Sequence, residues 1–314
     1  MIGVGFALQS KVHVPGPQPI TLTDWASQIQ RQGPEQAYQI FKQETAKENV
    51  EEQHIQAHAF GQALYEVQGV KGVTVCDSAF GFGCFHQFFL SAIMGEGLEI
   101  VPQLDEACIQ KFGLGGQGCQ HGIGHGLVEY FSHDLSQALN VCAKMKWQKP
   151  LFGCQSGVFM EYNFPTFVDE NGGRRQSRQF DKTQPFSPCF EIPDRFHLSC
   201  VYAQAEWWDK GLSLNYSEMG EYCRTLTESD LRQICFIGIG VSAVSAGNFE
   251  TEAVLQACGE MSGEAAQISC RGGGYWGFFD AGANFHEQAK ILCNKGLREK
   301  QRNQCVLEGS LQNL

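Results

Sequence analysis

Apolar and polar residues follow a helical period through most of the chain, and the pattern repeats about every 35 residues. A first amphipathic segment, such as 252–258 or 288–293, is followed by a more apolar segment, such as 119–131 or 154–162. A repeat of this length with two helical halves is typical of helical hairpins stacked into a solenoid. We therefore predict an all-α fold, an α-solenoid of about seven 35-residue helical hairpin repeats.

The cysteines follow the same period, and the 14 cysteines form seven pairs at separations of 8 to 12 residues. The chain has no clustered CxxC pairs of the kind that zinc sites need. One pair per repeat instead predicts a local disulfide that joins the two helices of each hairpin. Disulfides persist in oxidising compartments, so we expect an extracellular or periplasmic protein. The predicted pairs are Cys76–Cys84, Cys108–Cys119, Cys142–Cys154, Cys189–Cys200, Cys223–Cys235, Cys258–Cys270 and Cys293–Cys305.

Paired helices with one disulfide per repeat, over about residues 76–314, resemble the cysteine-rich Sel1-like repeat proteins, relatives of the tetratricopeptide class. The resemblance is one of architecture. In that family the two cysteines lie closer together, and its alanine and leucine–glycine positions are not recognisable in this chain. The resemblance implies secretion and the binding of a peptide or another partner, and it assigns no binding residue.

The two ends of the array and one internal step depart from the regular repeat. Three prolines near the N-terminus predict extended chain, and the longer step between Cys154 and Cys200 predicts a polar, turn-rich insertion. The predicted organisation is an extended arm at 1–32 and a single solenoid domain at 33–314, with cap helices at 33–70, disulfide repeats at 71–314 and a surface insertion at 165–188.

Charge and hydropathy narrow the range of partners. The chain has 23 Lys and Arg against 34 Asp and Glu, a net charge of -11, which argues against a nucleic-acid or anionic-membrane surface. No stretch reaches the length of a transmembrane helix, and the apolar residues Met1–Leu8 are interpreted as the stub of a trimmed signal or anchor. The partners that remain are a small molecule, a peptide or a protein.

A small residue occupies the third position after the second cysteine in five repeats. Glycine inside a helix costs about 1 kcal/mol relative to alanine, so this position needs a reason. We expect the close approach of a neighbouring helix, because the alternative, a phosphate-binding loop, lacks a preceding strand and a GK[ST] ending. The residues are Gly122, Gly157, Ala203, Gly238 and Gly273.

Five of the nine histidines gather in three consecutive predicted helices. His54 and His58 are four residues apart, and so are His121 and His125, which places each pair on one helical face. His86 occupies in its repeat the position that His121 occupies in the next one. Later repeats have other residues at these positions, so packing alone does not require imidazole.

This pattern suits a divalent transition metal, because imidazole binds zinc, copper and iron and two rings one turn apart can share an ion. We expect zinc first, with copper or iron as alternatives. Glu129, four residues after His125, is the candidate catalytic residue, as a ligand, as an outer partner that orients a ligating histidine, or as a general base on a metal-bound water. The alternative is that the histidines belong to the core or the surface and bind no metal.

Two functional hypotheses follow. The first is a secreted metal-binding repeat protein, with hydrolytic or oxidative catalysis at the metal left open, since HExxH and GxSxG motifs are absent. The second is a non-catalytic scaffold that binds a peptide, glycan or partner protein on its concave surface, as solenoids commonly do. For the aromatic residues Trp207–Trp208, Tyr275–Trp276 and Phe278–Phe279 we expect burial between repeats, and exposure on the concave face would instead indicate a glycan or peptide groove.

Overall fold

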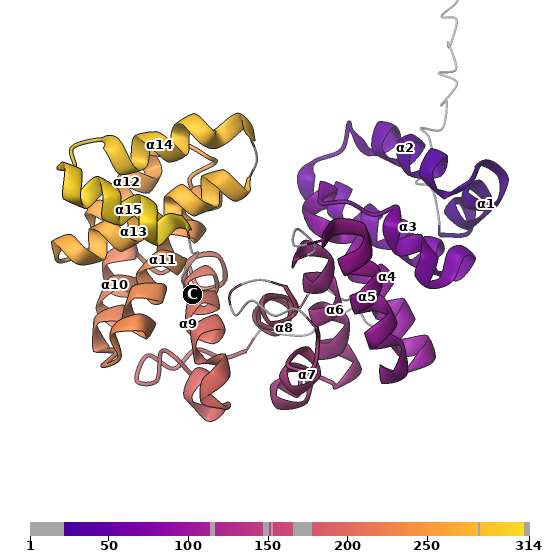
Figure 1. The fold of residues 1–314 in the computed structure, drawn as a ribbon, viewed down its shortest axis with the longest axis horizontal. Coiled ribbons are helices and arrows are strands. Elements are labelled where there is room, and N and C mark those ends of the chain that lie inside the picture. The colour runs from indigo at the N-terminus through magenta and orange to yellow at the C-terminus, as the bar shows by residue number, and fades with distance from the viewer. Residues whose placement is uncertain are drawn as a thin grey trace, which may run out of the picture.

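The structure is a computed structural model, drawn in Figure 1. It describes residues 22–113, 117–146, 151, 153–165, 178–281 and 283–310. Within these ranges the chain forms fifteen α-helices and no strand, which confirms the predicted all-α repeat architecture.

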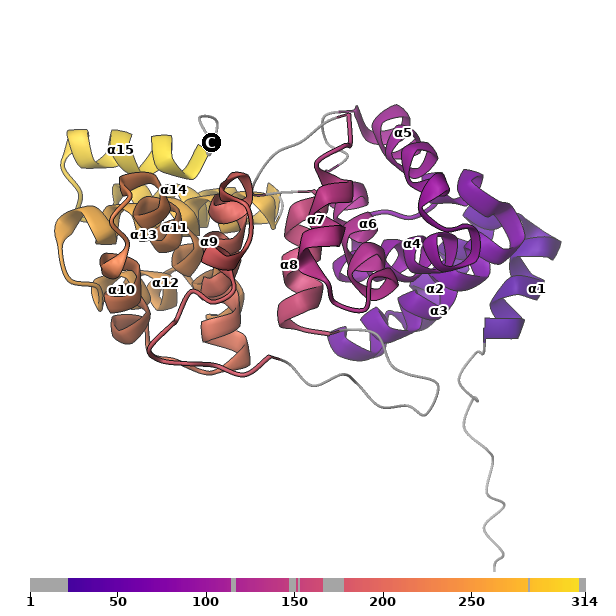
Figure 2. The same cartoon turned by 90° about the horizontal axis from the view of Figure 1, so that it is seen from below.

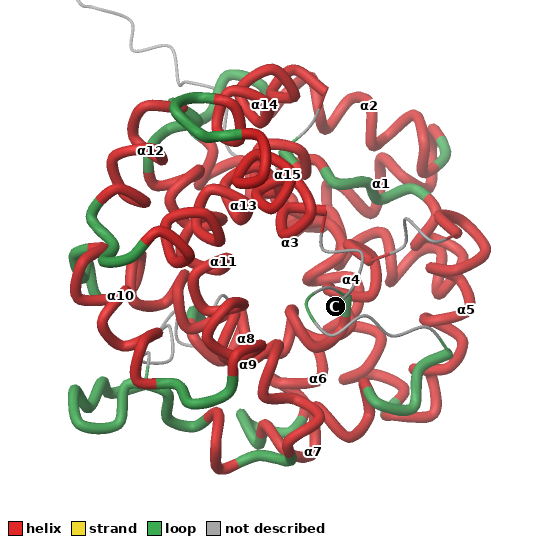
Figure 3. The backbone as a smooth tube through the Cα atoms, turned by 60° about the vertical axis from the view of Figure 1, so that its left-hand side comes forward, coloured by secondary structure: helices red, strands yellow, loops and turns green. Residues whose placement is uncertain are grey.

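The helices form an inner and an outer layer, and Figure 3 shows the inner helices around a central axis with the outer ones at the periphery. Each inner helix packs on the next along the whole array. The inner helices are α3 (Val50–Gln68), α4 (Gly83–Glu96), α6 (Gln117–Tyr130), α8 (Cys154–Asn163), α9 (His197–Glu206), α11 (Ser229–Ala246), α13 (Glu264–Asp280) and α15 (Glu299–Ser310). The outer helices are α1 (Leu22–Gln32), α2 (Pro34–Thr45), α5 (Val101–Phe112), α7 (Leu135–Cys142), α10 (Tyr216–Thr225), α12 (Thr251–Gly259) and α14 (His286–Asn294).

All seven predicted disulfides form, and no cysteine is free. Each joins an outer segment to one of the first seven residues of an inner helix, and closing such a short loop is worth roughly 2–3 kcal/mol. In the described part of the chain two repeats have a short turn where the others have an outer α-helix: Cys76 follows the turn Gly69–Thr74, and Cys189 begins the turn Cys189–Glu191. Seven disulfides indicate an oxidising compartment. Among the residues described, no helix has the length and apolar character to cross a bilayer.

Glycines bring the backbones of consecutive inner helices into direct contact. A Cβ added at Gly157 on α8 would lie 1.9 Å from the carbonyl oxygen of His121 on α6. A Cβ added at Gly273 on α13 would lie 2.0 Å from the carbonyl oxygen of Ile237 on α11. Real Cβ atoms do not approach this closely, so the expected reason for small residues at these positions, close helix packing, is confirmed.

The N-terminal arm that the sequence predicts at 1–32 is wrong for residues 22–32, which form helix α1. Trp25 and Ile29 lie one turn apart and are each 1% exposed. The Trp25 ring packs against Phe41 and Phe60, with centroids 5.2 and 5.5 Å away. Burial of this apolar stripe makes the segment helical. The upstream prolines predict extended chain only in their own neighbourhood and do not prevent a helix that begins at Leu22. Residues 1–21, including the predicted anchor stub, lie outside the described residues.

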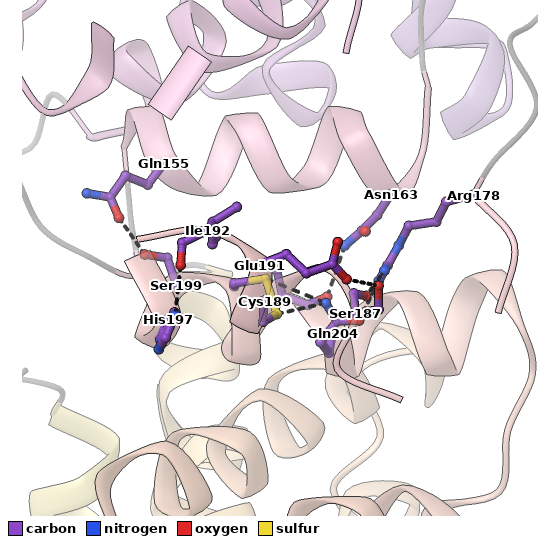
Figure 4. Close-up of a disulfide and its surroundings, with 12 residues drawn as sticks. Gln155, Asn163, Arg178, Ser187, Cys189, Glu191, Ile192, His197, Ser199 and Gln204 are labelled. Carbon is purple, nitrogen blue, oxygen red and sulfur yellow. Dashed lines mark hydrogen bonds between the residues drawn. A yellow bond between two sulfur atoms is a disulfide. The ribbon is translucent and has the colours of Figure 1, made fainter. Parts of the chain in front are cut away.

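The N-terminal and C-terminal halves of the array meet between α8 and α9 (Figures 1 and 2). Polar contacts connect the two helices here: the Ser199 hydroxyl donates to the Gln155 side-chain oxygen in a buried contact, and Asn163 Nδ2 donates to the Ala203 carbonyl at 3.3 Å in a partly buried one (Figure 4). The predicted surface insertion falls at this junction, and its residues 166–177 lie outside the described part of the chain.

Arg178 is the first described residue after the gap in the insertion, and its side chain connects this segment to α9. Its guanidinium donates to the Ser187 carbonyl and the Gln204 side-chain oxygen (Figure 4), and it lies 3.5 Å above the Trp207 ring. Burial lowers the pKa of Arg178 to about 10, so the side chain keeps its charge at neutral pH. Trp207, Trp208 and Phe278 are 1%, 0% and 0% exposed, which confirms their expected place in the core, whereas the same expectation is wrong for Phe279, which is 45% exposed.

We expect Gly157→Ala to lower the free energy of unfolding by about 1–3 kcal/mol, because the new methyl group cannot coexist with the His121 carbonyl unless a helix moves. The matched control is Gly95→Ala on α4, where an added Cβ meets nothing within 4 Å. That change should be neutral or stabilising by up to about 1 kcal/mol, because alanine favours helix. Urea unfolding followed by circular dichroism measures both, and equal stabilities for the two variants would contradict the packing argument.

Candidate metal centre

The structure brings all five sequence-predicted histidines into one cluster, which we call the histidine cluster. Helix α3 contributes His54 and His58, α4 contributes His86, and α6 contributes His121 and His125. Since α3 packs on α4 and α4 packs on α6, the side chains meet between adjacent inner helices.

The ring nitrogens within the cluster are close enough to share ions. His54 and His58 place their Nε2 atoms 3.1 Å apart, and the Nε2 atoms of His121 and His125 are 2.9 Å apart. Two nitrogens bound tetrahedrally to one zinc ion at its usual bond length lie about 3.4 Å apart. Two groups of three, His54–His58–His86 and His86–His121–His125, each have ligand atoms within 4.8 Å of one another. The spacing is therefore close to that of a metal site.

Hydrogen bonds on the outer side of the rings orient the inner nitrogens. His54 Nδ1 donates to the Phe80 carbonyl at 2.7 Å, and His125 Nδ1 donates to the Glu161 carboxylate at 2.6 Å. Carbonyl and carboxylate oxygens accept the proton, so Nε2 of each ring carries a lone pair that faces the cluster. His121 Nδ1 forms a hydrogen bond at 2.7 Å with the Ser156 hydroxyl, which can donate or accept, so this contact orients the ring without fixing its tautomer. Metal-ligating histidines commonly have such outer partners.

Burial keeps three rings of the cluster, those of His86, His121 and His125, in the neutral form that ligates metals. His86 and His125 are 2% and 0% exposed. Burial, together with the nearby histidines, lowers the pKa of His86 and of His121 well below the ordinary value, and burial followed by the neighbouring His54 lowers the pKa of His125 to about 3. The three rings are therefore neutral at pH 7.

His86 is the central residue of the cluster and the most costly to bury. Both of its ring nitrogens are buried, and neither has a hydrogen-bond partner among the described residues. Its ring stacks on that of His125, with centroids 4.0 Å apart, and lies within 6 Å of the other three ring centroids. An unsatisfied buried polar group costs about 1–3 kcal/mol, so an unpartnered imidazole at the centre of the cluster needs a ligand or a compensating interaction.

The short loop before α4 covers the cluster, and sequence reasoning missed it. Phe80, Gly81 and Phe82 have φ values of 59°, 56° and 64°, a left-handed conformation that is unfavourable for the two phenylalanines. This conformation directs the Phe80 carbonyl to His54 and brings the Phe82 ring centroid to 6.2 Å from that of His121. Only the glycine between two aromatic residues signals it in the sequence.

Glu129, the predicted catalytic residue, hydrogen-bonds at 2.7 Å to His133 Nε2 on the next turn. The carboxylate on His125 is instead Glu161 of α8, which is fully buried. Ser156 lies 35 residues after His121, at the equivalent position of the next repeat. The repeat period by itself could therefore have predicted that these two side chains lie close together. A catalytic role for Glu129 remains a prediction.

The fold and the disulfides define a disulfide-rich α-helical repeat protein. No family model, curated protein sequence or solved structure matches the chain. Seven local disulfides at about 35-residue spacing in an all-helical array are consistent with the Sel1-like architecture that the sequence resembles.

Without added metal, the protein should lose stability as the pH falls below about 6.5. The unfolded chain binds protons at His86, His121 and His125 that the folded protein does not bind, because their folded pKa values are lowered. Each such histidine lowers the free energy of unfolding by about 1.4 kcal/mol per pH unit between the two pKa values.

Urea unfolding between pH 7.5 and 5, with a chelator present, measures this effect. This pH range lies above the pKa values of most carboxylates, so their titration contributes little. A His86→Phe variant should show a shallower decline, because phenylalanine does not titrate. A His286→Ala variant, altered outside the cluster on α14, should keep the wild-type slope. A flat wild-type profile would show that the three histidines titrate normally in the folded state.

Proposed function

We propose that the protein binds a divalent transition metal through the histidine cluster, with zinc as the first choice and copper or iron as alternatives. The observation that carries this proposal is the pairing of inward Nε2 atoms, at 2.9 and 3.1 Å, with Nδ1 atoms held from outside. His54 and His125 each direct an Nε2 lone pair at the Nε2 of the facing ring, and without metal the facing ring can donate an N–H to it. A metal ion can take the place of that proton and bind several lone pairs at once.

The chemistry of the whole chain favours imidazole as the ligand. All cysteines are in disulfides, so no thiolate is available, and an extracellular or periplasmic compartment would oxidise an exposed one. Imidazole is not oxidised under these conditions and suits zinc, copper and iron alike. Zinc has no redox chemistry of its own and accepts three histidines readily, which is why it is placed first.

For a catalytic role of the bound metal, the proposal names one residue, Glu129. If the bound ion activates water, Glu129 is the candidate general base, and its negative charge already acts to raise the pKa of His125. The competing hypothesis, a scaffold that binds a peptide, glycan or partner protein without metal, has less support. Of the aromatic residues that such a groove would expose, Trp207, Trp208 and Phe278 are buried in the core and Phe279 is exposed.

Metal binding is tested on the full chain after chelation and dialysis, by elemental analysis and by calorimetric titration with Zn²⁺. The wild type should bind zinc, and a His121→Ala, His125→Ala double variant should lose affinity by at least about tenfold, with His286→Ala as the matched control. Disulfide mapping and circular dichroism show that each variant is folded. A wild type that binds no zinc, copper or iron would contradict the proposal and favour the scaffold hypothesis.

Glu161 and Glu129 should differ in their effect on metal affinity. Glu161→Ala removes the acceptor that holds His125 Nδ1, and we expect a loss of about 10–100-fold. Glu161→Gln keeps an oxygen that accepts the same hydrogen bond and should lose less. Glu129→Ala, which breaks only the contact with His133, should leave zinc affinity nearly unchanged. Similar losses for Glu129→Ala and Glu161→Ala in the titration would overturn this assignment.

A further inference from the structure

We propose that the histidine cluster holds two metal ions and that His86 bridges them, one ion at each ring nitrogen. This inference rests on the proposed metal binding and deepens it. The ligand atoms that lie within 4.8 Å of one another form two groups of three in the described part of the chain, and His86 is the member that they share.

In the described part of the chain each group of ligand atoms within 4.8 Å of one another contains three histidines and none contains all five, so the geometry does not suit a single ion that uses every ring. Two nitrogens bound to one ion, each about 2.1 Å from it, lie no more than about 4.2 Å apart. The cluster divides instead into the pair on α3 and the pair on α6, each with its own close Nε2 contact, and His86 on α4 stands between them. One ion can therefore use either pair together with His86, and both pairs are used only when two ions bind.

The hydrogen bonds assign the bridging role to His86. His54, His121 and His125 each have Nδ1 tied to an outer partner, which leaves one nitrogen for a metal. His86 has both nitrogens buried and without a hydrogen-bond partner. A single ion would satisfy one of them and leave the other buried and unpaired, whereas two ions satisfy both.

A bridge of this kind also balances charge. The neutral His86 ring carries one N–H proton, and this proton passes to solvent when the second ion binds, so that the bridge becomes an imidazolate anion between two cations. The ring then separates the two ions by about 6 Å. Each ion has three imidazole ligands and retains a further position, which a water molecule or an anionic ligand can take.

The first test is metal stoichiometry, measured as zinc per chain after gel filtration. We expect two zinc ions in the wild type and in the His286→Ala control. We expect one in the His54→Ala, His58→Ala variant and one in the His121→Ala, His125→Ala variant, since each keeps one half of the cluster. One zinc ion in the wild type would overturn the bridge and leave the proposed function intact. No bound metal would overturn both.

The second test is electron paramagnetic resonance of the protein loaded with Cu²⁺ at low temperature. Two cupric ions joined by an imidazolate couple their spins, so the wild-type signal should be smaller than its copper content requires. Each double variant, with one copper ion, should give the full signal of that ion. A wild type that holds two copper ions and gives two full, uncoupled signals would overturn the bridge. Because the double variants leave His86 in place, the test does not depend on the folding of a His86 variant.

Discussion

Direct backbone contact between consecutive inner helices is the constraint on which the rest of the structure depends. A Cβ at Gly61 of α3 would lie 2.1 Å from the Cys84 carbonyl of α4, and a Cβ at Gly157 of α8 would lie 1.9 Å from the His121 carbonyl. These contacts set the distance at which α3, α4, α6 and α8 stack. The same distance lets imidazoles from three helices share one small volume, with the hydrogen-bond partners of His121 and His125 on the fourth. The fold and the candidate site therefore depend on the same glycines.

The disulfides perform a complementary task. A repeat array has no single compact centre, and each hairpin must be held by its own contacts and by those of its neighbours. A local disulfide anchors every inner helix from α4 onward, and in the described residues the repeats at Cys76 and Cys189 have a short turn where the others have an outer helix. It also removes all thiols from metal chemistry, which leaves histidine as the ligand that the chain can offer.

The histidine cluster opposes stability and therefore points to function. An apolar residue at position 86 would fill the space between α3, α4 and α6 without leaving two unpaired ring nitrogens in the core. The left-handed conformation of Phe80 and Phe82 adds a further local cost beside the same rings. Local costs that gather at one site are typical of ligand-binding centres, where the bound group supplies the missing interactions.

The sequence by itself determined the all-α class, the seven disulfides and the identity of the five clustered histidines, because all three depend on spacing along the chain. A period of about 35 residues places equivalent positions on adjacent inner helices, and cysteines 8 to 12 residues apart can meet only within one hairpin. The tertiary structure alone decided that 22–32 is helical, since the driving force is burial of Trp25 against residues far along the chain. It also decided that Glu161, and not Glu129, holds His125. Which carboxylate reaches His125 depends on how α8 is rotated against α6. Close packing of the two helices fixes this rotation, and residue spacing within one helix gives no information about it.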